Sequence, residues 1–355
     1  NILRYRLRKF KRGYIIWITL ISLLVNLWLD NIRFRIFQTN YDKRNKIQIQ
    51  RTYTGHLDML ALRTSYHGPT SAAQSVTGIA SWRHPGMPGH VSFVAEPNQY
   101  RGIFGENAGA EPYLDEIDRT IKSTTEGQIA GMIVESVQGY GGIIAMPKSY
   151  MSGAAERVRA AGGLYIADEV QAGFGRTGDN MWGFEADDVI PDIIVMAKGM
   201  GNGFPIGAVV THKKIAVPMA EKFMFHTYGA NPTSCAAARA VLDVLRQDKI
   251  QQNAKKVGGV LYHKLLDLKE RHRSIGDVRG RGLMLAIEMV KDRKTKEPDP
   301  EVTAAVFENC RDSGLILSKS GPHQSVLRMV PPMCLNADDV DKVADGLNRA
   351  FNALG

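Results

Sequence analysis

Cysteine is scarce in this chain, and its few cysteines form no recognisable pattern. The 355 residues include three cysteines, Cys235, Cys310 and Cys334, without a CxxC or a His–Cys spacing. Zinc sites need such closely spaced ligands, so the sequence predicts no metal site. Scattered cysteines are also typical of proteins from a reducing compartment.

Beyond its first 53 residues the chain has no excess of positive charge. The formal net charge is +9, but residues 1–53 alone carry +10, from eight Arg and four Lys against two Asp, so residues 54–355 sum to −1. The isoelectric point of about 9.4 therefore reflects the N-terminal segment. Because a basic surface is the usual footprint of nucleic-acid binding, we predict no nucleic-acid partner.

The N-terminal segment 1–53 lacks Ala, Pro, Glu and Met, although it contains nine Ile and five Asn. Residues 14–29 form a 16-residue, mostly apolar run behind basic residues 9–12, short of the roughly 20 residues that span a bilayer. For a transit peptide the segment is too hydrophobic and too poor in Ser. We interpret it as translated AT-rich non-coding sequence joined to an enzyme near Thr54. The alternative is a membrane anchor over residues 9–29, with membrane association through 14–29.

The chain does contain two apolar runs that end in chemically useful residues. One run in residues 164–178 ends at Asp168, and another in residues 192–208 ends at Lys198, 30 residues further on. Short apolar runs bounded by Gly and Pro are typical of buried strands, and long connections favour a parallel sheet. A carboxylate and an amine at the ends of such strands are expected to share the crevice where α/β sheets bind ligands.

The residues after Lys198 suit covalent chemistry. Lys198 is followed by Gly-Met-Gly-Asn-Gly, which leaves its amine on an uncrowded backbone. A Schiff base to an aldehyde cofactor needs such an amine, and Asp168 can keep a pyridine nitrogen protonated. Taken alone, Lys198 could also be a surface lysine, and Asp168 could be a helix N-cap.

From Thr54 to Gly355 the chain resembles the class III (subgroup II) aminotransferases, and within them the alanine–glyoxylate aminotransferase 2 group. These are pyridoxal-phosphate (PLP) enzymes of fold type I. The resemblance therefore implies a PLP cofactor, a large domain with a mostly parallel sheet flanked by helices, and a smaller C-terminal α+β domain. It is carried by motifs at residues 66–68, 135–139, 167–171, 196–205, 226–232 and 327–332.

The resemblance assigns cofactor roles to five residues. Lys198 corresponds to the catalytic lysine that forms the Schiff base and shuttles a proton, and Asp168 to the partner of the pyridine nitrogen. Val170 would pack on one face of the cofactor ring, and Gln171 would reach its phenolic O3′. Tyr66, in Tyr66-His67-Gly68, would lie near the opposite face, although it could equally be an ordinary core residue.

Three further residues receive roles in substrate binding and assembly. Arg328 resembles the arginine that binds the substrate α-carboxylate, for which its planar fork is suited. Glu135 resembles a glutamate that can pair with such an arginine when no carboxylate is bound. Thr227 resembles the threonine that reaches the phosphate of the neighbouring subunit's cofactor, which implies a homodimer. Arg328 could instead be a solvated strand-edge residue, and Thr227 a helix cap. We expect structural roles for Glu169, His67, His226, Arg176 and Arg279.

One element of the family pattern is missing. The family has a Gly-Ser loop that opens a helix upstream of Tyr-His-Gly, and its backbone N–H groups bind the cofactor phosphate. Residues 36–53 contain no glycine and no such motif. We therefore expect the N-terminal part of the family fold to be missing and PLP binding to be impaired.

We divide the chain into a leader outside the enzyme fold (1–53), a truncated PLP-binding large domain (54–245) and a small domain with its connecting helix (246–355). In the large domain the sequence predicts strands near 59–64, 131–135, 164–168, 193–197 and 206–210, and helices over 147–161 and 232–245. In the small domain it predicts helices over 250–271 and 337–353, and strands near 282–290, 315–317 and 326–330.

The resemblance implies a transaminase that moves an amino group from an amino acid, alanine, to a keto acid, glyoxylate. The same motifs serve ornithine, 4-aminobutyrate and β-alanine transaminases, and a mutase or decarboxylase of the same fold is a further enzymatic alternative. A truncated copy that acts only through dimerisation belongs to a different class. Since the group is mitochondrial, we expect that location; the C-terminal Ala-Leu-Gly is not a peroxisomal signal.

Overall fold

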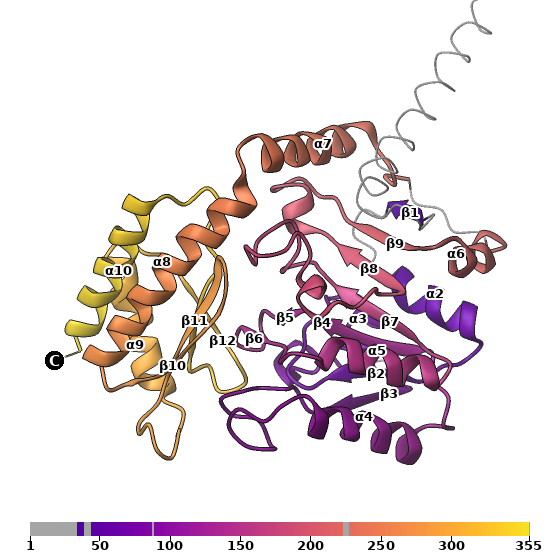
Figure 1. The fold of residues 1–355 in the computed structure, drawn as a ribbon, viewed down its shortest axis with the longest axis horizontal. Coiled ribbons are helices and arrows are strands. Elements are labelled where there is room, and N and C mark those ends of the chain that lie inside the picture. The colour runs from indigo at the N-terminus through magenta and orange to yellow at the C-terminus, as the bar shows by residue number, and fades with distance from the viewer. Residues whose placement is uncertain (1–33, 39–43, 87–88, 223–226, 355) are drawn as a thin grey trace, which may run out of the picture.

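The structure is a computed structural model that describes residues 34–38, 44–86, 89–222 and 227–354. Its elements form two neighbouring parts, a large part built on a seven-stranded sheet and a small part built on a four-stranded sheet (Figure 1). Helix α7 (Pro232–Gln247) leads from the first part to the second.

The sheet of the large part is mostly parallel. Its strands from β8 to β3 are parallel neighbours, while β9 and β1 add antiparallel pairs at one edge. The central strands are apolar and buried along their length, as expected for a sheet covered on both faces. In spatial order the strands are β1 (Phe34–Gln38), β9 (Ala208–His212), β8 (Ile193–Met196), β7 (Leu164–Asp168), β4 (Gly131–Glu135), β2 (Met59–Leu62) and β3 (Val91–Val94).

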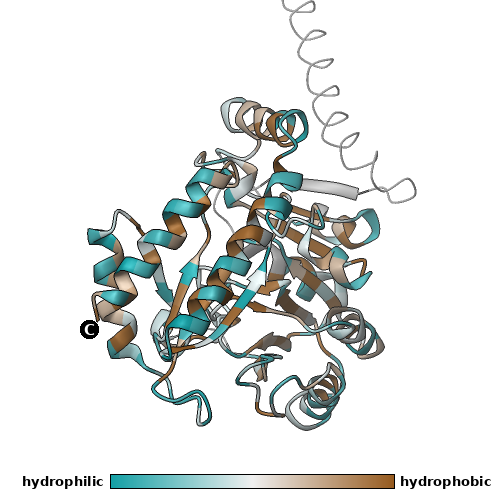
Figure 2. Cartoon of the chain, turned by 60° about the vertical axis from the view of Figure 1, so that its left-hand side comes forward, coloured by the Kyte–Doolittle hydropathy of each residue, from teal (hydrophilic) through white to brown (hydrophobic). Residues whose placement is uncertain are grey.

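Alternating side chains of the strands pack against helices on opposite faces of the large sheet. In β4, Met132 and Val134 belong to the apolar cluster that includes α4 (Glu111–Thr124) and α5 (Tyr150–Ala160). Ile133, between them, belongs to the cluster on the other face, with residues of α2 (Arg44–Thr54) and α6 (Lys213–Ala220). In Figure 2 the apolar colour is accordingly concentrated on the strands, between helices of mixed colour.

Part of the N-terminal segment belongs to this core, which corrects the prediction that the fold begins at Thr54. Strand β1 pairs with β9, and Ile47 and Ile49 of α2 are buried in the core. The Gln50 amide, also buried, donates to the Leu164 carbonyl at 3.1 Å. The predicted boundary between residues 53 and 54 therefore falls inside helix α2.

The basic residues 9–12 and the apolar run 14–29 lie outside the described residues. None of the helices among the described residues is long and apolar enough to cross a membrane. The Gly-Ser loop expected by analogy would precede α2, where residues 39–43 are likewise outside the described ranges.

The small part is an antiparallel sheet covered by helices on one face. Its strands lie in the order β10 (Ile275–Arg281), β11 (Met284–Met289), β13 (Val326–Met329) and β12 (Ser318–Ser320). Leu285 and Ile287 face the cluster formed with α8 (Ile250–Arg271), α9 (Pro300–Asp312) and α10 (Ala337–Asn352). Met284 and Ala286 face the other way and pack on Val137 and Ile143 of the large part, beside the hairpin β5 (Val137–Gln138) and β6 (Ile144–Ala145).

Local sequence signals explain where the later helices begin. The side chains of Asn231, Asp299 and Asn336 accept the backbone N–H three residues on, at the starts of α7, α9 and α10. Pro follows the first two caps, at a position where its missing N–H has no cost. The strand predicted at 315–317 lies three residues further along the chain, as β12 at 318–320.

Candidate active site

The predicted carboxylate and amine lie at the same edge of the large sheet. Strand pairing places Glu135 of β4 directly beside Asp168 of β7, and Asp168 beside Val195 of β8. Lys198 follows β8 at the start of a short 3-10 helix, Lys198–Met200. All three functional side chains thus project from the carboxyl ends of neighbouring parallel strands, which is where α/β sheets bind ligands.

Asp168 is a buried carboxylate with fixed orientation. Its Oδ1 accepts the backbone N–H of Val170 at 3.2 Å, and its Oδ2 lies 2.8 Å from Nδ1 of His67. Asp168 is 3% exposed and His67 is fully buried. Since an ionised carboxylate can only accept, His67 Nδ1 is the donor, and the contact fixes both side chains. His67 therefore orients Asp168, which agrees with the structural role that we expected for this histidine.

Lys198 has an unusual backbone conformation. Its φ is +41°, in the left-handed region that a non-glycine residue rarely adopts. The backbone N–H groups of Gly201 and Asn202 donate to the Lys198 carbonyl at 3.1 and 3.2 Å, which stabilises the turn. Such local strain is concentrated at functional sites. The residue as a whole is exposed at this edge of the sheet.

Both carboxylate oxygens of Glu135 accept hydrogen bonds from backbone N–H groups. Its Oε1 accepts the N–H of Tyr66 at 3.1 Å and its Oε2 accepts the N–H of Gly139 at 3.0 Å. Burial, followed by the nearby Asp168 charge, raises the pKa of Glu135 to about 7, while the two backbone bonds and Lys198 act in the opposite direction. Glu135 therefore ties the Tyr66 segment to the loop after β4.

Arg328 reaches the site from β13 of the small part. Its Nε donates to Ser318 Oγ at 3.2 Å, and its Nη1 donates to Gln171 Oε1 at 3.5 Å. Its guanidinium lies over the Tyr140 ring, 5.8 Å from the ring centroid. Burial lowers the pKa of Arg328, against the opposing effects of Tyr140 and Glu135. Among the described residues no carboxylate forms an ion pair with this arginine, so the pairing with Glu135 that the resemblance implied is not formed in this structure.

An aromatic cluster lies beside Arg328. Tyr66, Trp82 and Tyr140 form a cluster with ring centroids 5.0 to 6.1 Å apart. Trp82 lies in the short 3-10 helix Ala80–Trp82, and Tyr140 in the loop between β5 and β6. The sequence analysis missed Trp82 and Tyr140; the position of Tyr140, five residues after Glu135, was the available signal.

The other predicted site residues, Val170, Gln171 and Thr227, differ in how far they are buried. Val170 is buried in the cluster under the sheet, and Gln171 follows it at the surface of the site. The amide of Gln171 also fits closely over Gly139, where an added Cβ would lie 2.4 Å from it. Thr227 lies exposed in the turn before α7, and its proposed contact with a neighbouring subunit stays a prediction. Among the described residues no three His, Cys, Asp or Glu side chains are grouped as a metal site requires.

Comparison with known proteins is consistent with this geometry. The family model described as aminotransferase class-III matches residues 39–351. The chain is 43% identical over 308 residues to the Arabidopsis thaliana protein named alanine–glyoxylate aminotransferase 2 homolog 2, mitochondrial, and the match covers 87% of this chain and 64% of that protein. It is 35% identical over 325 residues to the human alanine–glyoxylate aminotransferase 2, mitochondrial, covering 85% and 63%. The chain thus spans just under two thirds of the length of these curated relatives.

Solved structures give the same result for the fold. A Bacillus anthracis aminotransferase superposes with a TM-score of 0.88 at 29% identity, covering 95% of this chain and 80% of that one. An amine transaminase from an uncultivated Pseudomonas species, solved in its PLP-bound form, also gives 0.88, at 30% identity, covering 96% and 81%. These neighbours have PLP fold type I, and the family and the PLP-bound neighbour identify pyridoxal phosphate as the cofactor. The chain belongs to the class III aminotransferases.

Proposed function

We propose that this chain transfers the amino group of alanine to glyoxylate, with PLP bound covalently through the Lys198 amine. The relatives named alanine–glyoxylate aminotransferase 2 support this choice of substrates. The observation that carries the proposal is the register of the large sheet. It pairs Glu135 with Asp168, and Lys198 follows the end of the next strand, β8.

The residues present at the sheet edge fit the ring of PLP. Asp168 is a buried anion fixed by His67 and by the N–H of Val170, which suits a protonated pyridine nitrogen. Gln171 follows at the surface of the site and would reach the phenolic oxygen. When bound, PLP supplies an electron sink that stabilises negative charge at the substrate Cα.

The Lys198 amine then acts as the base of the reaction. With PLP bound, it would accept the proton that leaves the substrate Cα and would later donate it to complete the transfer. Its backbone lies in an exposed turn with a positive φ at the sheet edge. Its positive charge acts to lower the pKa of Glu135, against the larger effect of burial.

Arg328 would bind the substrate α-carboxylate with its planar fork. Its present partners are a hydroxyl and an amide, and both can be exchanged for a carboxylate at low cost. Alanine and glyoxylate both have a carboxylate next to the reacting carbon, so one arginine without an internal ion pair serves both half-reactions. The Tyr140 ring lies beside Arg328 and packs in turn on Trp82, and these rings favour substrates with small side chains.

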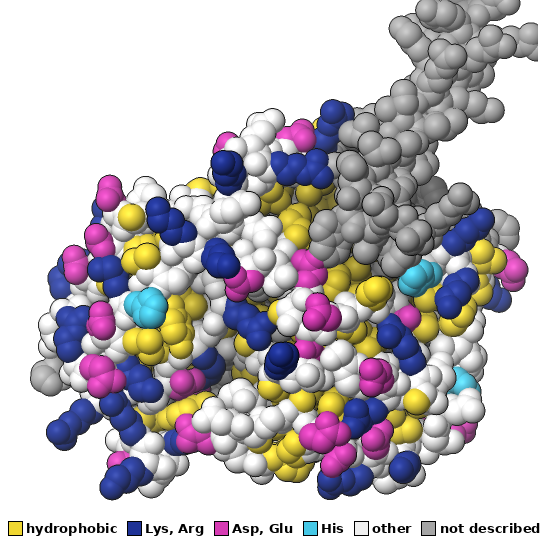
Figure 3. Space-filling view, viewed as in Figure 1, with side chains coloured by type: hydrophobic (Ala, Val, Ile, Leu, Met, Phe, Trp, Pro, Cys, Tyr) yellow, Lys and Arg dark blue, Asp and Glu magenta, His cyan; other side chains and the backbone are white. Residues whose placement is uncertain are grey.

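The phosphate and the second subunit are further parts of this proposal. Thr227 is exposed in the turn before α7 and is available to a neighbouring copy. We propose a homodimer in which Thr227 contacts the phosphate of the partner's cofactor. By the same analogy we propose a mitochondrial location, following the names of the relatives. In Figure 3 positive and negative side chains are interspersed over the visible face.

The test is amino-group exchange with labelled substrate. The purified chain is incubated with PLP, ¹⁵N-alanine and glyoxylate, and labelled glycine is measured by mass spectrometry. We expect labelled glycine and pyruvate in equal amounts. Ornithine, 4-aminobutyrate and β-alanine are tested as alternative amino donors. If kcat/KM is higher with one of them than with alanine, that compound is the preferred donor. Exchange restored only after residues 1–53 are replaced by a family-like N-terminus would indicate impaired PLP binding in this chain.

A further inference from the structure

One face of the small sheet is turned toward the large part, and its charged residues other than Arg328 have no role in the chemistry above. The register pairs Asp277 with Glu288 and Glu288 with Val326. It also pairs Arg279 with Ala286 and Ala286 with Arg328. Paired residues and residues two apart share a face, so Glu288, Arg279 and Arg328 point to the same side.

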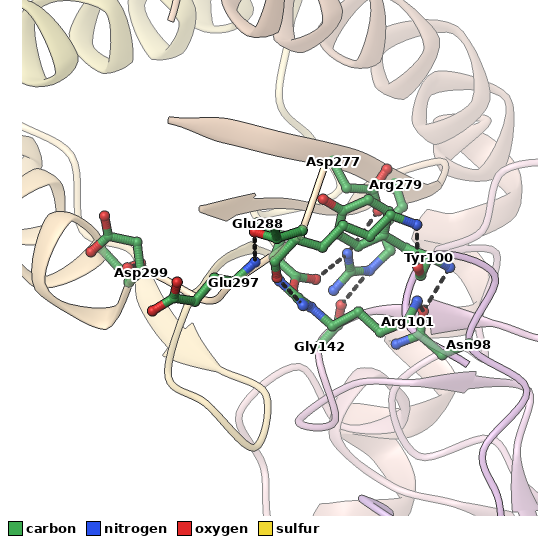
Figure 4. Close-up of polar contacts among 12 residues, drawn as sticks. Asn98, Tyr100, Arg101, Gly142, Asp277, Arg279, Glu288, Glu297 and Asp299 are labelled. Carbon is green, nitrogen blue, oxygen red and sulfur yellow. Dashed lines mark hydrogen bonds and ion pairs between the residues drawn. The ribbon is translucent and has the colours of Figure 1, made fainter. Parts of the chain in front are cut away.

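Glu288 joins the two parts of the molecule. It is 2% exposed, its Oε1 accepts from Nε of Arg101, and its Oε2 pairs with Nη1 of Arg279 at 2.7 Å (Figure 4). Arg101 belongs to the large part, in the segment after β3, whereas Arg279 belongs to β10. Nε of Arg279 donates in turn to the Gly142 carbonyl at 2.8 Å. One buried carboxylate therefore links cations from both sides of the contact.

The surroundings of this carboxylate leave little room for movement. The Tyr100 ring lies against Arg101, at 5.2 Å from its guanidinium carbon, and against Lys296, at 4.6 Å from its amine. Lys296 also pairs with Glu106 at 2.8 Å, and its carbonyl accepts from Arg101. A Cβ added to Gly276 would lie 2.5 Å from the Tyr100 hydroxyl. The cluster is thus close-packed as well as charged.

The same contact continues to the substrate site. Gly142 lies in the loop that carries Tyr140, and the Tyr140 carbonyl accepts the N–H of Gly321 at 2.9 Å. Beside it, Val137 packs on Ala286 and Val326. Apolar contacts are non-directional and allow sliding, whereas a buried ion pair has a defined geometry. The Glu288 contacts are therefore among those that set the distance between Arg328 and the loop of Tyr140, together with the Arg279–Asp277 pair at 2.8 Å and the Gly321–Tyr140 hydrogen bond.

We propose that Glu288 is a positioning residue for the substrate carboxylate. By bridging Arg101 and Arg279 it sets the position of β13, and hence of Arg328, relative to the large-domain loop that carries Tyr140. The inference rests on the proposed function for its kinetic consequence, because the carboxylate of the substrate is the group that Arg328 would bind. Its structural consequence can be measured without that function.

The kinetic test compares Glu288→Gln with Glu297→Gln in the full chain with PLP. A glutamine at 288 retains one acceptor but turns an N–H donor toward a guanidinium; Glu297 is a matched control because it pairs with Lys291 at the surface of the same region. A displacement of about 1 Å can cost up to about 100-fold. Because Arg328 would bind the carboxylate and not the reacting carbon, we expect the loss as at least about a tenfold rise in KM for alanine, with kcat nearly unchanged. The rate with isopropylamine, which has no carboxylate, should not change. In an Arg328→Gln background, Glu288→Gln should add no further loss.

Hydrogen exchange measures the positioning itself. In Glu288→Gln we expect faster amide exchange in both 139–146 and 326–329, with 131–135 unchanged, and no change in Glu297→Gln. Arg279→Lys, which retains the charge but loses the fork between Glu288 and Gly142, should reproduce the effect if Glu288→Gln does not fold. Unchanged exchange in both segments would overturn the proposal. Equal losses with alanine and isopropylamine would also overturn it, whereas absence of transfer in the unmodified chain would refute only the proposed function.

Discussion

Replacing Arg328 tests how the substrate is recognised. In Arg328→Gln the side chain keeps a polar end but loses the positive fork that would bind the carboxylate. Two hydrogen bonds to a charged group contribute about 3–6 kcal/mol, from which the bonds given up to Ser318 and Gln171, about 1 kcal/mol each, are subtracted. The net loss of about 1–4 kcal/mol corresponds to a fall of about 5- to 700-fold in kcat/KM.

The assay for Arg328→Gln is steady-state transamination with two donors. Alanine has the carboxylate and isopropylamine does not, so the variant should lose most of its kcat/KM for alanine while its value for isopropylamine stays within about twofold. Arg328→Lys should fall between the two, because lysine retains the charge but not the planar fork. An equal loss with both donors would contradict carboxylate binding by Arg328 and would indicate a packing role in β13.

Three further substitutions address the other residues of the site. Asp168→Asn removes the anion opposite His67, and the loss of a charge-assisted bond, about 1.5–3 kcal/mol, should lower kcat about 10- to 150-fold and weaken PLP binding in a fluorescence titration. Tyr140→Glu places a carboxylate beside Arg328, so KM for alanine should rise about 5- to 30-fold, and an unchanged KM would exclude the contact. The pKa of buried Glu169 is raised from 4.5 to about 7, chiefly by burial, so the native state binds more protons in between. The contribution of Glu169 to the free energy of unfolding is therefore fully present below pH 4.5, and about 3 kcal/mol of it is lost as the pH rises through 7. In urea unfolding, the free energy of unfolding of Glu169→Gln should depend less steeply on pH than that of the unmodified chain.

The central strands and the positions of Asp168 and Lys198 at one edge of the sheet were predictable because their signals are local. Strands 131–135 and 164–168 and helix 250–271 were predicted with the observed bounds, since each is a continuous apolar run or a periodic stretch with clear ends. Strand β9 was expected at 206–210 but covers 208–212 and runs antiparallel, which depends on its pairing with β8 and cannot be read from its own residues.

The roles of His67, Tyr140 and Glu288 could not be predicted from the sequence in this way. His67 reaches Asp168 across 101 residues of sequence, and Glu288 reaches Arg101 across 187. Such contacts depend on strand order and on how the two sheets meet, and neither follows from periodicity. Composition was misleading for residues 44–53, where a segment of unusual composition still forms an amphipathic helix that buries Ile47 and Ile49.

The most direct test of the account is to identify the residue that bonds the cofactor. The chain is incubated with PLP, reduced with borohydride, digested and analysed by mass spectrometry. The account predicts one modified lysine, Lys198, absorbance above about 400 nm before reduction, and loss of both in Lys198→Ala while the variant remains folded. Modification at another lysine, or the same absorbance in Lys198→Ala, would contradict it.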